Sequence, residues 1–275
     1  MQLKLIYFGT DLLSSCVDVF LDQGHSIEAL YVGAEEVCTQ QILEKVKKLS
    51  IPIFTERPTL AAMERHLETG VNLFFSAEYQ FKIPVPDTLR YAVNLHTSLL
   101  PVGRGASTLP YLIERYPEAA GLTLHKLTEN FDEGDIVSKH KIHVQSDESL
   151  NTLSVKMHLE APKFLEKVLE NFDQYYRQAS IQKDGEYWQI PSVDRRIIDW
   201  YLPVERLRKQ FKSFGHFGSI MRLDDQYWWV TYAEAIKAPS GRPPGDLLFQ
   251  SNDLLAVSCL DGFVCIPKTG IKPVC

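Results

Sequence analysis

The sequence lacks the features that mark membrane, secreted and metal-binding proteins. No apolar run approaches the roughly 18 residues of a membrane span, and the N-terminus has no signal-peptide pattern. We therefore expect a cytoplasmic protein without membrane contacts. The five cysteines are odd in number, scattered and without a Cys-x-x-Cys pair, which argues against a disulfide framework and a zinc site. No His-Glu-x-x-His occurs either, so we expect no metal.

Several enzyme motifs are absent as well. No Gly-x-Gly-x-x-Gly follows the first apolar run, which argues against a nicotinamide dehydrogenase. The segment Gly103-Arg104-Gly105 lacks the Lys-Ser or Lys-Thr that completes a phosphate-binding loop. There is no Gly-x-Ser-x-Gly, so a serine nucleophile of the hydrolase type is not expected.

Positive charge is not in excess. The chain has 29 Lys and Arg against 35 Asp and Glu, a net charge of −6 over 275 residues. Proteins that grip a phosphate backbone usually carry a basic excess, so we expect no nucleic-acid partner. With 45% hydrophobic and 23% charged residues, the composition is that of an ordinary globular protein with one large or two smaller domains.

Short apolar runs alternate with longer periodic segments through the first two thirds of the chain. This order predicts an α/β fold, a Rossmann-like and mostly parallel sheet with helices on both faces. The expected strands are Leu3–Phe8, Ile27–Val32, Ile51–Phe54, Val71–Ser76, Ala92–His96, Gly121–Leu127 and Ile136–Val144. The expected helical segments are 11–23, Val37–Leu49, Thr59–Glu68 and Leu150–Leu169.

The pattern changes after Asn171. A helix is expected over Pro203–Phe214, and the short alternating runs that follow, separated by turn sequences, predict a small antiparallel β module. We therefore predict two domains, an α/β domain at 1–190 and a helix-plus-β domain at 191–275.

The end of the strand Ala92–His96 is the first candidate site. Ligands of open α/β sheets bind outside the carboxyl ends of the strands, and residues two apart on a strand point to the same side. Asn94 and His96 would thus deliver an amide donor and an acid/base group together. Alternatively, both side chains only hydrogen-bond the Pro101–Gly105 loop that follows.

The polar loop 128–135 is the second candidate. It is either a solvated turn or the source of a carboxylate, Asp132, that orients His96 and raises its basicity.

At these residues the chain resembles a family. Asn94-Leu95-His96-Thr97-Ser98-Leu99-Leu100-Pro101, the following Gly103-Arg104-Gly105-Ala106, and Phe131-Asp132-Glu133-Gly134-Asp135-Ile136 strongly resemble the folate-dependent formyltransferases. The opening Leu5-Ile6-Tyr7-Phe8-Gly9-Thr10, the later Ile198-Asp199-Trp200 and the closing Ser258-Cys259-Leu260-Asp261-Gly262 are similar to methionyl-tRNA formyltransferases. The resemblance covers most of the chain, in order.

The resemblance implies that Asn94, His96 and Asp132 are catalytic and that 10-formyltetrahydrofolate is the formyl donor. The formyl group would pass to a primary amine through a tetrahedral intermediate. Asn94 would donate to the oxyanion, His96 would take the proton of the amine or stabilise the intermediate, and Asp132 would hold His96 and relay a proton. The family also implies a folate pocket, with these cofactor-binding residues: Phe81, Ile83, Thr128, Phe131 and Asp132. Phe81 has an alternative interpretation as an ordinary core aromatic.

Departures from the tRNA enzymes indicate which amine is formylated. Their basic insertion after the second strand is missing, since Val32 runs through Gly33-Ala34-Glu35-Glu36 into a helix. Residues 191–275 carry 11 Lys and Arg against 9 Asp and Glu, a net charge of only +2, and RNA phosphates need several cationic contacts. The chain looks most like the nucleotide-sugar N-formyltransferases, which implies a nucleotide-linked amino sugar such as a dTDP-3-amino- or dTDP-4-amino-6-deoxyhexose.

The residues expected to bind that sugar are Thr10, Glu78, Tyr79, Gln80, Arg104 and Trp200. Arg104 could pair with the diphosphate or only brace its own loop, and Trp200 could stack on the base or anchor a domain interface. The alternatives are a methionyl-tRNA formyltransferase and a non-catalytic binding homologue. Edge strands in the C-terminal module suggest a homodimer.

Overall fold

The computed structural model describes residues 2–33, 38–223 and 226–274, in two compact units. The first contains residues 1–108, 118–143 and 154–189, and the second contains 109–117, 144–153 and 190–275. That residues 1–190 and 191–275 form two independent domains stays a prediction. Within the described ranges, no helix has the length and apolar character needed to cross a bilayer.

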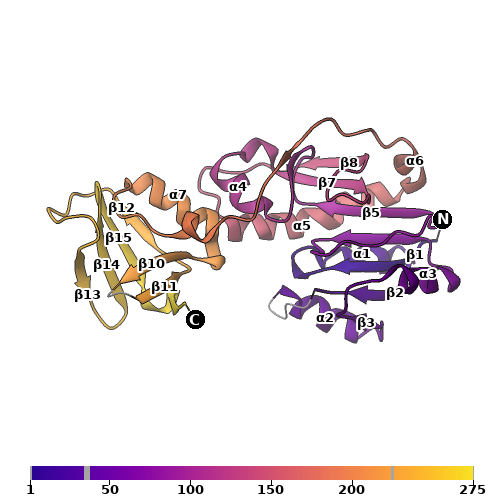
Figure 1. Cartoon of the computed structure of the whole chain (residues 1–275), viewed down its shortest axis with the longest axis horizontal. Coiled ribbons are helices and arrows are strands. Elements are labelled where there is room, and N and C mark those ends of the chain that lie inside the picture. The colour runs from indigo at the N-terminus through magenta and orange to yellow at the C-terminus, as the bar shows by residue number, and fades with distance from the viewer. Residues whose placement is uncertain (1, 34–37, 224–225, 275) are drawn as a thin grey trace. The chain divides into compact units, whose positions relative to one another are not determined.

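The first unit is built on a seven-stranded sheet in the order β3-β2-β1-β4-β5-β7-β8. The five strands from β3 to β5 are parallel, whereas β7 is antiparallel to both β5 and β8. Figure 1 shows these strands side by side. Their bounds are β1 Lys4–Gly9, β2 Ser26–Tyr31, β3 Ile53–Phe54, β4 Leu73–Ala77, β5 Tyr91–His96, β7 Gly121–Lys126 and β8 Ile136–Lys141. Two short strands, β6 Val102–Arg104 and β9 Glu186–Tyr187, pair separately.

Helices flank this sheet because its strands are apolar on both faces. In β1, Phe8 belongs to a buried cluster with Met63 of α3, while Tyr7 points to the opposite face. There Tyr7 meets Phe75 of β4, which packs edge-on against Phe20 of α1. The helices are α1 Cys16–Asp22, α2 Gln40–Lys47, α3 Leu60–Glu68, α4 Thr108–Glu114, α5 Leu150–Leu169 and α6 Phe172–Arg177.

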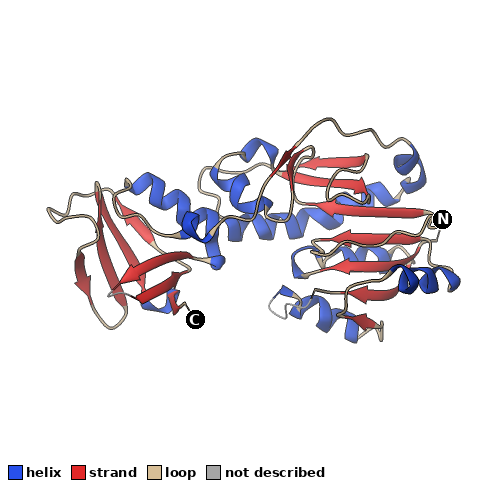
Figure 2. Ribbon diagram, viewed as in Figure 1, coloured by secondary structure: helices blue, strands red, loops and turns tan. Residues whose placement is uncertain are grey.

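The second unit packs helix α7 and two small antiparallel sheets around its own core (Figure 2). The sheets have the orders β10-β11-β16 and β12-β15-β14-β13. Val204 and Leu207 of α7 are fully buried with Val264 and Ile266 of β15. The elements are α7 Val204–Phe214, β10 Ser219–Leu223, β11 Gln226–Val230, β12 Glu234–Ile236, β13 Leu247–Gln250, β14 Leu254–Cys259, β15 Gly262–Pro267 and β16 Ile271–Pro273.

The predicted fold class is confirmed, with a mostly parallel sheet flanked by helices and an antiparallel β part at the C-terminus. Helix α5 has the predicted bounds, and most other long elements shift by one to three residues. The helical segment expected at 11–23 instead divides into a 3-10 turn at Asp11–Leu13 and helix α1, which begins at Cys16. The helix predicted at Val37–Leu49 begins at Gln40, and residues 34–37 lie outside the described part of the chain. The sequence did not indicate α4, α6, β6 or β9, because they are too short to show a periodic pattern.

Candidate active site

Strand β5 supplies the first two candidate residues. Asn94 and His96 point to the same face, and β7 lies antiparallel beside them with Asn94 opposite His125 and His96 opposite Thr123. His96 is only 5% exposed. The alternation of a strand therefore places the Asn94 amide and the His96 imidazole side by side, as the sequence predicts.

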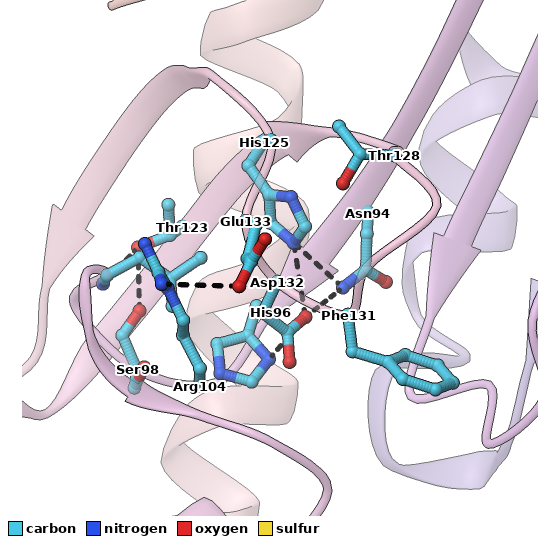
Figure 3. Close-up of polar contacts among 12 residues, drawn as sticks. Asn94, His96, Ser98, Arg104, Thr123, His125, Thr128, Phe131, Asp132 and Glu133 are labelled. Atoms are coloured by element: carbon cyan, nitrogen blue, oxygen red, sulfur yellow. Dashed lines mark hydrogen bonds and ion pairs between the residues drawn. The ribbon is translucent and has the colours of Figure 1, made fainter. Parts of the chain in front are cut away.

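Asp132 joins them from the loop between β7 and β8 (Figure 3). Its Oδ1 lies 3.5 Å from Nδ1 of His96, 3.2 Å from Nδ2 of Asn94 and 3.3 Å from Nε2 of His125. Its Oδ2 accepts a hydrogen bond of 2.8 Å from the backbone N–H of Gly105. The three predicted catalytic residues are thus gathered around one carboxylate that is 8% exposed.

The loop carrying Asp132 is clamped at several points. The amide of Gln182 donates to the carbonyl oxygens of Asp132 at 2.9 Å and Gly134 at 2.6 Å, and the hydroxyl of Tyr187 donates to the carbonyl of Phe131 at 2.5 Å. At Gly134 a Cβ atom would come within 1.8 Å of the Lys126 carbonyl oxygen. Only glycine permits this approach of the loop to β7.

The surroundings of Asp132 keep it ionised. Burial, the largest influence, acts to raise the pKa of Asp132, but the positive charge of His96 and the hydrogen bond from the Gly105 N–H hold it well below its ordinary value. The carboxylate is therefore a fixed negative charge at neutral pH.

Both nitrogens of His96 have partners. Nε2 lies 2.7 Å from the carbonyl oxygen of Gly103, which can only accept, so Nε2 carries a hydrogen. Nδ1 faces the carboxylate of Asp132. Both ends are hydrogen-bonded only when the ring holds two protons. Of the two roles predicted for His96, this arrangement favours stabilising a developing negative charge over removing the proton of the amine.

Glu78 lies beside this cluster, at the end of β4. Its carboxylate accepts a hydrogen bond of 3.0 Å from Oγ1 of Thr97, which in turn lies 2.7 Å from Oγ1 of Thr108. Glu78 has a φ of 62°, in the left-handed region that glutamate rarely adopts. Asp132 has a φ of 57°, so two left-handed residues meet at this site. Such strain is concentrated at functional sites because the surrounding structure must hold it.

Replacing Glu78 by glutamine should make the protein more stable than wild type at high pH but not at low pH. Burial raises the pKa of Glu78, opposed by His96 and Thr97 and reinforced by Asp132. When folding raises the pKa of a carboxyl group, ionisation of that group destabilises the folded state. This loss of stability begins as pH rises above the pKa that the group has in the unfolded chain. Glu78→Gln should therefore match wild-type Tm near pH 4 and exceed it at pH 8, by about 2–4 °C for each kcal/mol removed.

The control for this measurement is Glu133→Gln. Hydrogen bonds from Asn130 and Tyr187 lower the pKa of Glu133, so its ionised carboxylate stabilises the folded state. Glu133→Gln should therefore lower Tm at pH 8 or leave it unchanged, and should not raise it. A Glu78→Gln variant whose Tm falls, or shifts equally at every pH, would contradict the account of Glu78.

An apolar surface adjoins Asn94. Phe131 is 45% exposed in the Asp132 loop, and Figure 3 shows its ring near Asn94. Phe81 and Ile83 are partly buried and pack against the core cluster that includes Tyr79. The ammonium of Lys82 lies 5.9 Å from the Phe131 ring. Phe81 is therefore at least partly a core residue, which agrees with its alternative interpretation, and the folate contacts of Phe81, Ile83 and Phe131 stay predictions.

The other predicted site residues have structural contacts of their own. Arg104 is 8% exposed, donates to Gln182 at 3.1 Å and to the Lys183 carbonyl at 3.0 Å, and lies 3.7 Å from Glu133. It therefore braces the Asp132 loop, and a diphosphate contact stays a prediction. Thr128 bonds the Asn130 carbonyl within its own loop.

Four further predicted residues differ in their placement. Thr10 is half-buried at the end of β1, and Gln80 is exposed with its amide against Gly33. Tyr79 is 8% exposed, and its buried hydroxyl has no hydrogen-bond partner among the described residues. Trp200 belongs to the second unit, where it packs against that unit's core. Stacking on a base and anchoring of a domain interface both stay predictions for Trp200.

The sequence analysis missed His125. It is 1% exposed, and its Nε2 lies 3.0 Å from Nδ2 of Asn94. The strand Gly121–Leu127 was predicted, but its pairing with β5 was not, and only that pairing places His125 at the site. In the described part of the chain, no group of three or more His, Cys, Asp or Glu side chains is arranged to hold a metal ion.

Comparison with known proteins identifies the family. Residues 35–169 match the family model described as formyl transferase. A methionyl-tRNA formyltransferase from Herpetosiphon aurantiacus is 24% identical over 276 residues, which cover 93% of this chain and 89% of that protein.

Two solved structures share the fold. HypX from Aquifex aeolicus in complex with tetrahydrofolic acid has a TM-score of 0.71 at 16% identity over 97% of this chain, which spans only 44% of HypX. An N-formyltransferase from Helicobacter canadensis, in complex with folinic acid and dTDP-3-aminofucose, has a TM-score of 0.65 at 15% identity over 97% of this chain and 99% of its own. From its motifs, its fold and the family match, the chain belongs to the folate-dependent formyltransferases.

Proposed function

We propose that this protein transfers a formyl group from 10-formyltetrahydrofolate to the primary amine of a nucleotide-linked amino sugar, a dTDP-3-amino- or dTDP-4-amino-6-deoxyhexose. The observation that carries the chemistry is the meeting of Asn94, His96 and Asp132 around the Asp132 carboxylate. No serine or cysteine nucleophile is required, because the amine of the acceptor itself attacks the formyl carbon.

The roles follow from the contacts. As the amine nitrogen bonds to the formyl carbon, the formyl oxygen gains negative charge, which Asn94 and His96, side by side on β5, would stabilise by hydrogen bonds. The carbon–nitrogen bond to the folate then breaks, the leaving nitrogen takes a proton and the amine loses one. Asp132 is the carboxylate placed to pass that proton, with His96 held beside it.

The residues fit the formyl donor. The exposed Phe131 ring and the partly buried Phe81 and Ile83 form an apolar surface for a pterin beside Asn94. Two structural neighbours bear on this assignment, since one is a complex with tetrahydrofolic acid and the other with folinic acid. Phe131, Thr128 and Asp132 would hold the ring from one loop, and Phe81 and Ile83 from the other.

The choice of a sugar as acceptor rests on charge and on the neighbours. The Helicobacter canadensis enzyme binds dTDP-3-aminofucose, and another neighbour with a TM-score of 0.67 is a sugar N-formyltransferase from Shewanella. The net charge of −6 suits a small acceptor better than an RNA phosphate backbone. The acidic segment that replaces a basic insertion includes Ala34, Glu35 and Glu36, which lie outside the described residues.

A second candidate is methionyl-tRNA formylation. Its support is the sequence relatives, since proteins of that name match this chain at 22–26% identity. A non-catalytic homologue is the third, and the intact Asn94, His96 and Asp132 cluster argues against it.

The deciding experiment is a turnover assay with 10-formyltetrahydrofolate. The acceptors are nucleotide-linked 3-amino and 4-amino sugars and charged initiator methionyl-tRNA, with His96→Asn as the inactive control. We expect one sugar to be formylated and methionyl-tRNA to be left untouched. Formylated methionyl-tRNA with no formylated sugar would overturn the sugar proposal, and no product from any acceptor would favour the non-catalytic role.

The oligomeric state also stays a proposal. Strand β10 is an edge of its sheet, and Phe217, Tyr227 and Tyr232 near it are 48–54% exposed. Exposed aromatic residues beside a sheet edge favour association, so we propose a homodimer, which light scattering of the purified protein measures directly.

A further inference from the structure

His125 is a buried imidazole in the active site to which the proposed mechanism gives no role. It lies on β7 directly opposite Asn94 of β5 and is 1% exposed. Its ring centroid is 6.3 Å from that of His96, and the rings are nearly perpendicular. A buried titratable group so close to the reacting centre invites a functional explanation.

The hydrogen bonds of His125 define its tautomer. Nδ1 lies 2.9 Å from the carbonyl oxygen of Lys126, which can only accept, so Nδ1 carries a hydrogen. In a neutral ring Nε2 is then an acceptor. It lies 3.0 Å from Nδ2 of Asn94, which can only donate. The neutral Nδ1–H form therefore satisfies the contacts to Lys126 and Asn94 at once.

This contact fixes the Asn94 amide. Nδ2 of Asn94 also lies 3.2 Å from Oδ1 of Asp132, and that oxygen is only 3.3 Å from Nε2 of His125. If each of the two amide hydrogens pointed straight at its own acceptor, the two acceptors would lie about 5 Å apart at these distances. A hydrogen directed between these two acceptors, which lie only 3.3 Å apart, can serve both and leave the second amide hydrogen for another acceptor.

We propose that His125 is a positioning residue for formyl transfer. Its neutral Nε2, with Asp132, holds one Asn94 amide hydrogen so that the other is presented to the oxyanion. The inference rests on the proposed function, since it assumes that Asn94 is the oxyanion donor. A donor held in place before the reaction stabilises the transition state without reorganisation.

The charged and titratable groups that face His125 come from the Asp132 loop, from β5 and from the neighbouring Lys126. The loop contributes the Asp132 carboxylate, and β5 contributes Asn94 and the ring of His96. The ammonium of the neighbouring Lys126 is paired with Asp135 at 3.1 Å. Both ring nitrogens of His96 face acceptors, whereas Nε2 of His125 faces the Asn94 amide donor as well as the Asp132 carboxylate.

Substitutions test the role through kinetics. His125→Leu removes the acceptor, whereas the side-chain oxygen of His125→Gln can replace Nε2 as an acceptor. We expect His125→Leu to lower kcat about 10- to 100-fold, less than the loss of the donor itself, with KM for both substrates within about 2-fold. His125→Gln should recover most of kcat. His140→Gln, on β8 and paired with Glu160, is the control and should keep wild-type activity.

A double-mutant comparison with Asn94→Ala distinguishes a positioning role of His125 from a general role in stabilising the fold. In an Asn94→Ala background, His125→Leu should lower kcat by less than about 2-fold, because the group that it positions is already absent. A full 10- to 100-fold loss in that background, or a failure of His125→Gln to exceed His125→Leu, would overturn the proposal.

A spectroscopic test needs no substrate and no turnover. Nitrogen-15 NMR of histidine-labelled wild-type protein at pH 7.5 should show one ring as the neutral Nδ1–H tautomer, with its signals lost in His125→Gln. A doubly protonated or Nε2–H ring at His125 would overturn the inference even if sugar formylation succeeds. Failure of turnover with the expected tautomer would instead contradict the proposed function alone.

Discussion

Asp132→Asn is expected to lower kcat by about 10³-fold, within the range for losing a group that handles protons. The carboxylate lies 3.5 Å from Nδ1 of His96 and accepts hydrogen bonds from Asn94 and the Gly105 N–H. An amide of the same shape keeps the contact to Gly105 but removes the negative charge and the proton acceptor. Steady-state kinetics with the acceptor identified in the turnover assay measures the loss.

The fold should survive this substitution. Asp132 has a φ of 57°, and asparagine tolerates left-handed backbone about as well as aspartate does. Asp135→Asn is the matched control, because Asp135 ends the same loop and pairs with Lys126 instead of a site residue. A variant of Asp132 with near wild-type kcat, or an Asp135→Asn variant that is equally impaired, would contradict the central role of Asp132.

The low pKa of Asp132 has a consequence for pH dependence. Its surroundings hold the pKa below the ordinary value of 3.8, so the ionised form stabilises the folded state at pH values above that value. This contribution is lost only as pH falls through the lower, folded pKa. Any loss of activity between pH 5 and 7 should therefore be independent of Asp132 and persist in Asp132→Asn.

The sequence predicts the spatial relation of site residues only where they belong to the same short segment of the chain. Asn94 and His96 share a face because they are two residues apart on one strand, and that strand was recognisable from its apolar pattern. His125 required knowledge that β7 pairs antiparallel with β5 and that Asn94 lies opposite it. Pairing between strands distant in sequence is decided by packing over the whole sheet, and one sequence does not reveal it.

Glu78 and Arg104 illustrate a second limit. Glu78 was predicted at the site, but nothing in its local sequence signals a left-handed φ of 62°, because the surrounding packing imposes it. Arg104 was recognisable as a charged loop residue, but its burial and its contact with Gln182 depend on a segment about 80 residues away. Local patterns gave the residue types, and long-range contacts set their conformations.

Asn94→Ala is expected to lower kcat about 10²- to 10³-fold, the usual effect of removing one preorganised oxyanion donor. The donor is needed mainly in the transition state, because the formyl oxygen becomes negatively charged only as the amine attacks. KM for the formyl donor and for the acceptor should therefore change little. Steady-state kinetics gives kcat and KM, and calorimetry with a tetrahydrofolate analogue measures binding separately.

The control for Asn94→Ala is Asn130→Ala. Asn130 lies in the exposed part of the Asp132 loop, where its amide bonds Glu133 at 2.8 Å, so its loss should leave kcat within about 2-fold of wild type. If Asn94→Ala instead raises KM and leaves kcat unchanged, Asn94 binds substrate in the ground state and is not the oxyanion donor. The role assigned to His125 would then fail with it, since positioning an amide matters only if that amide acts in the transition state.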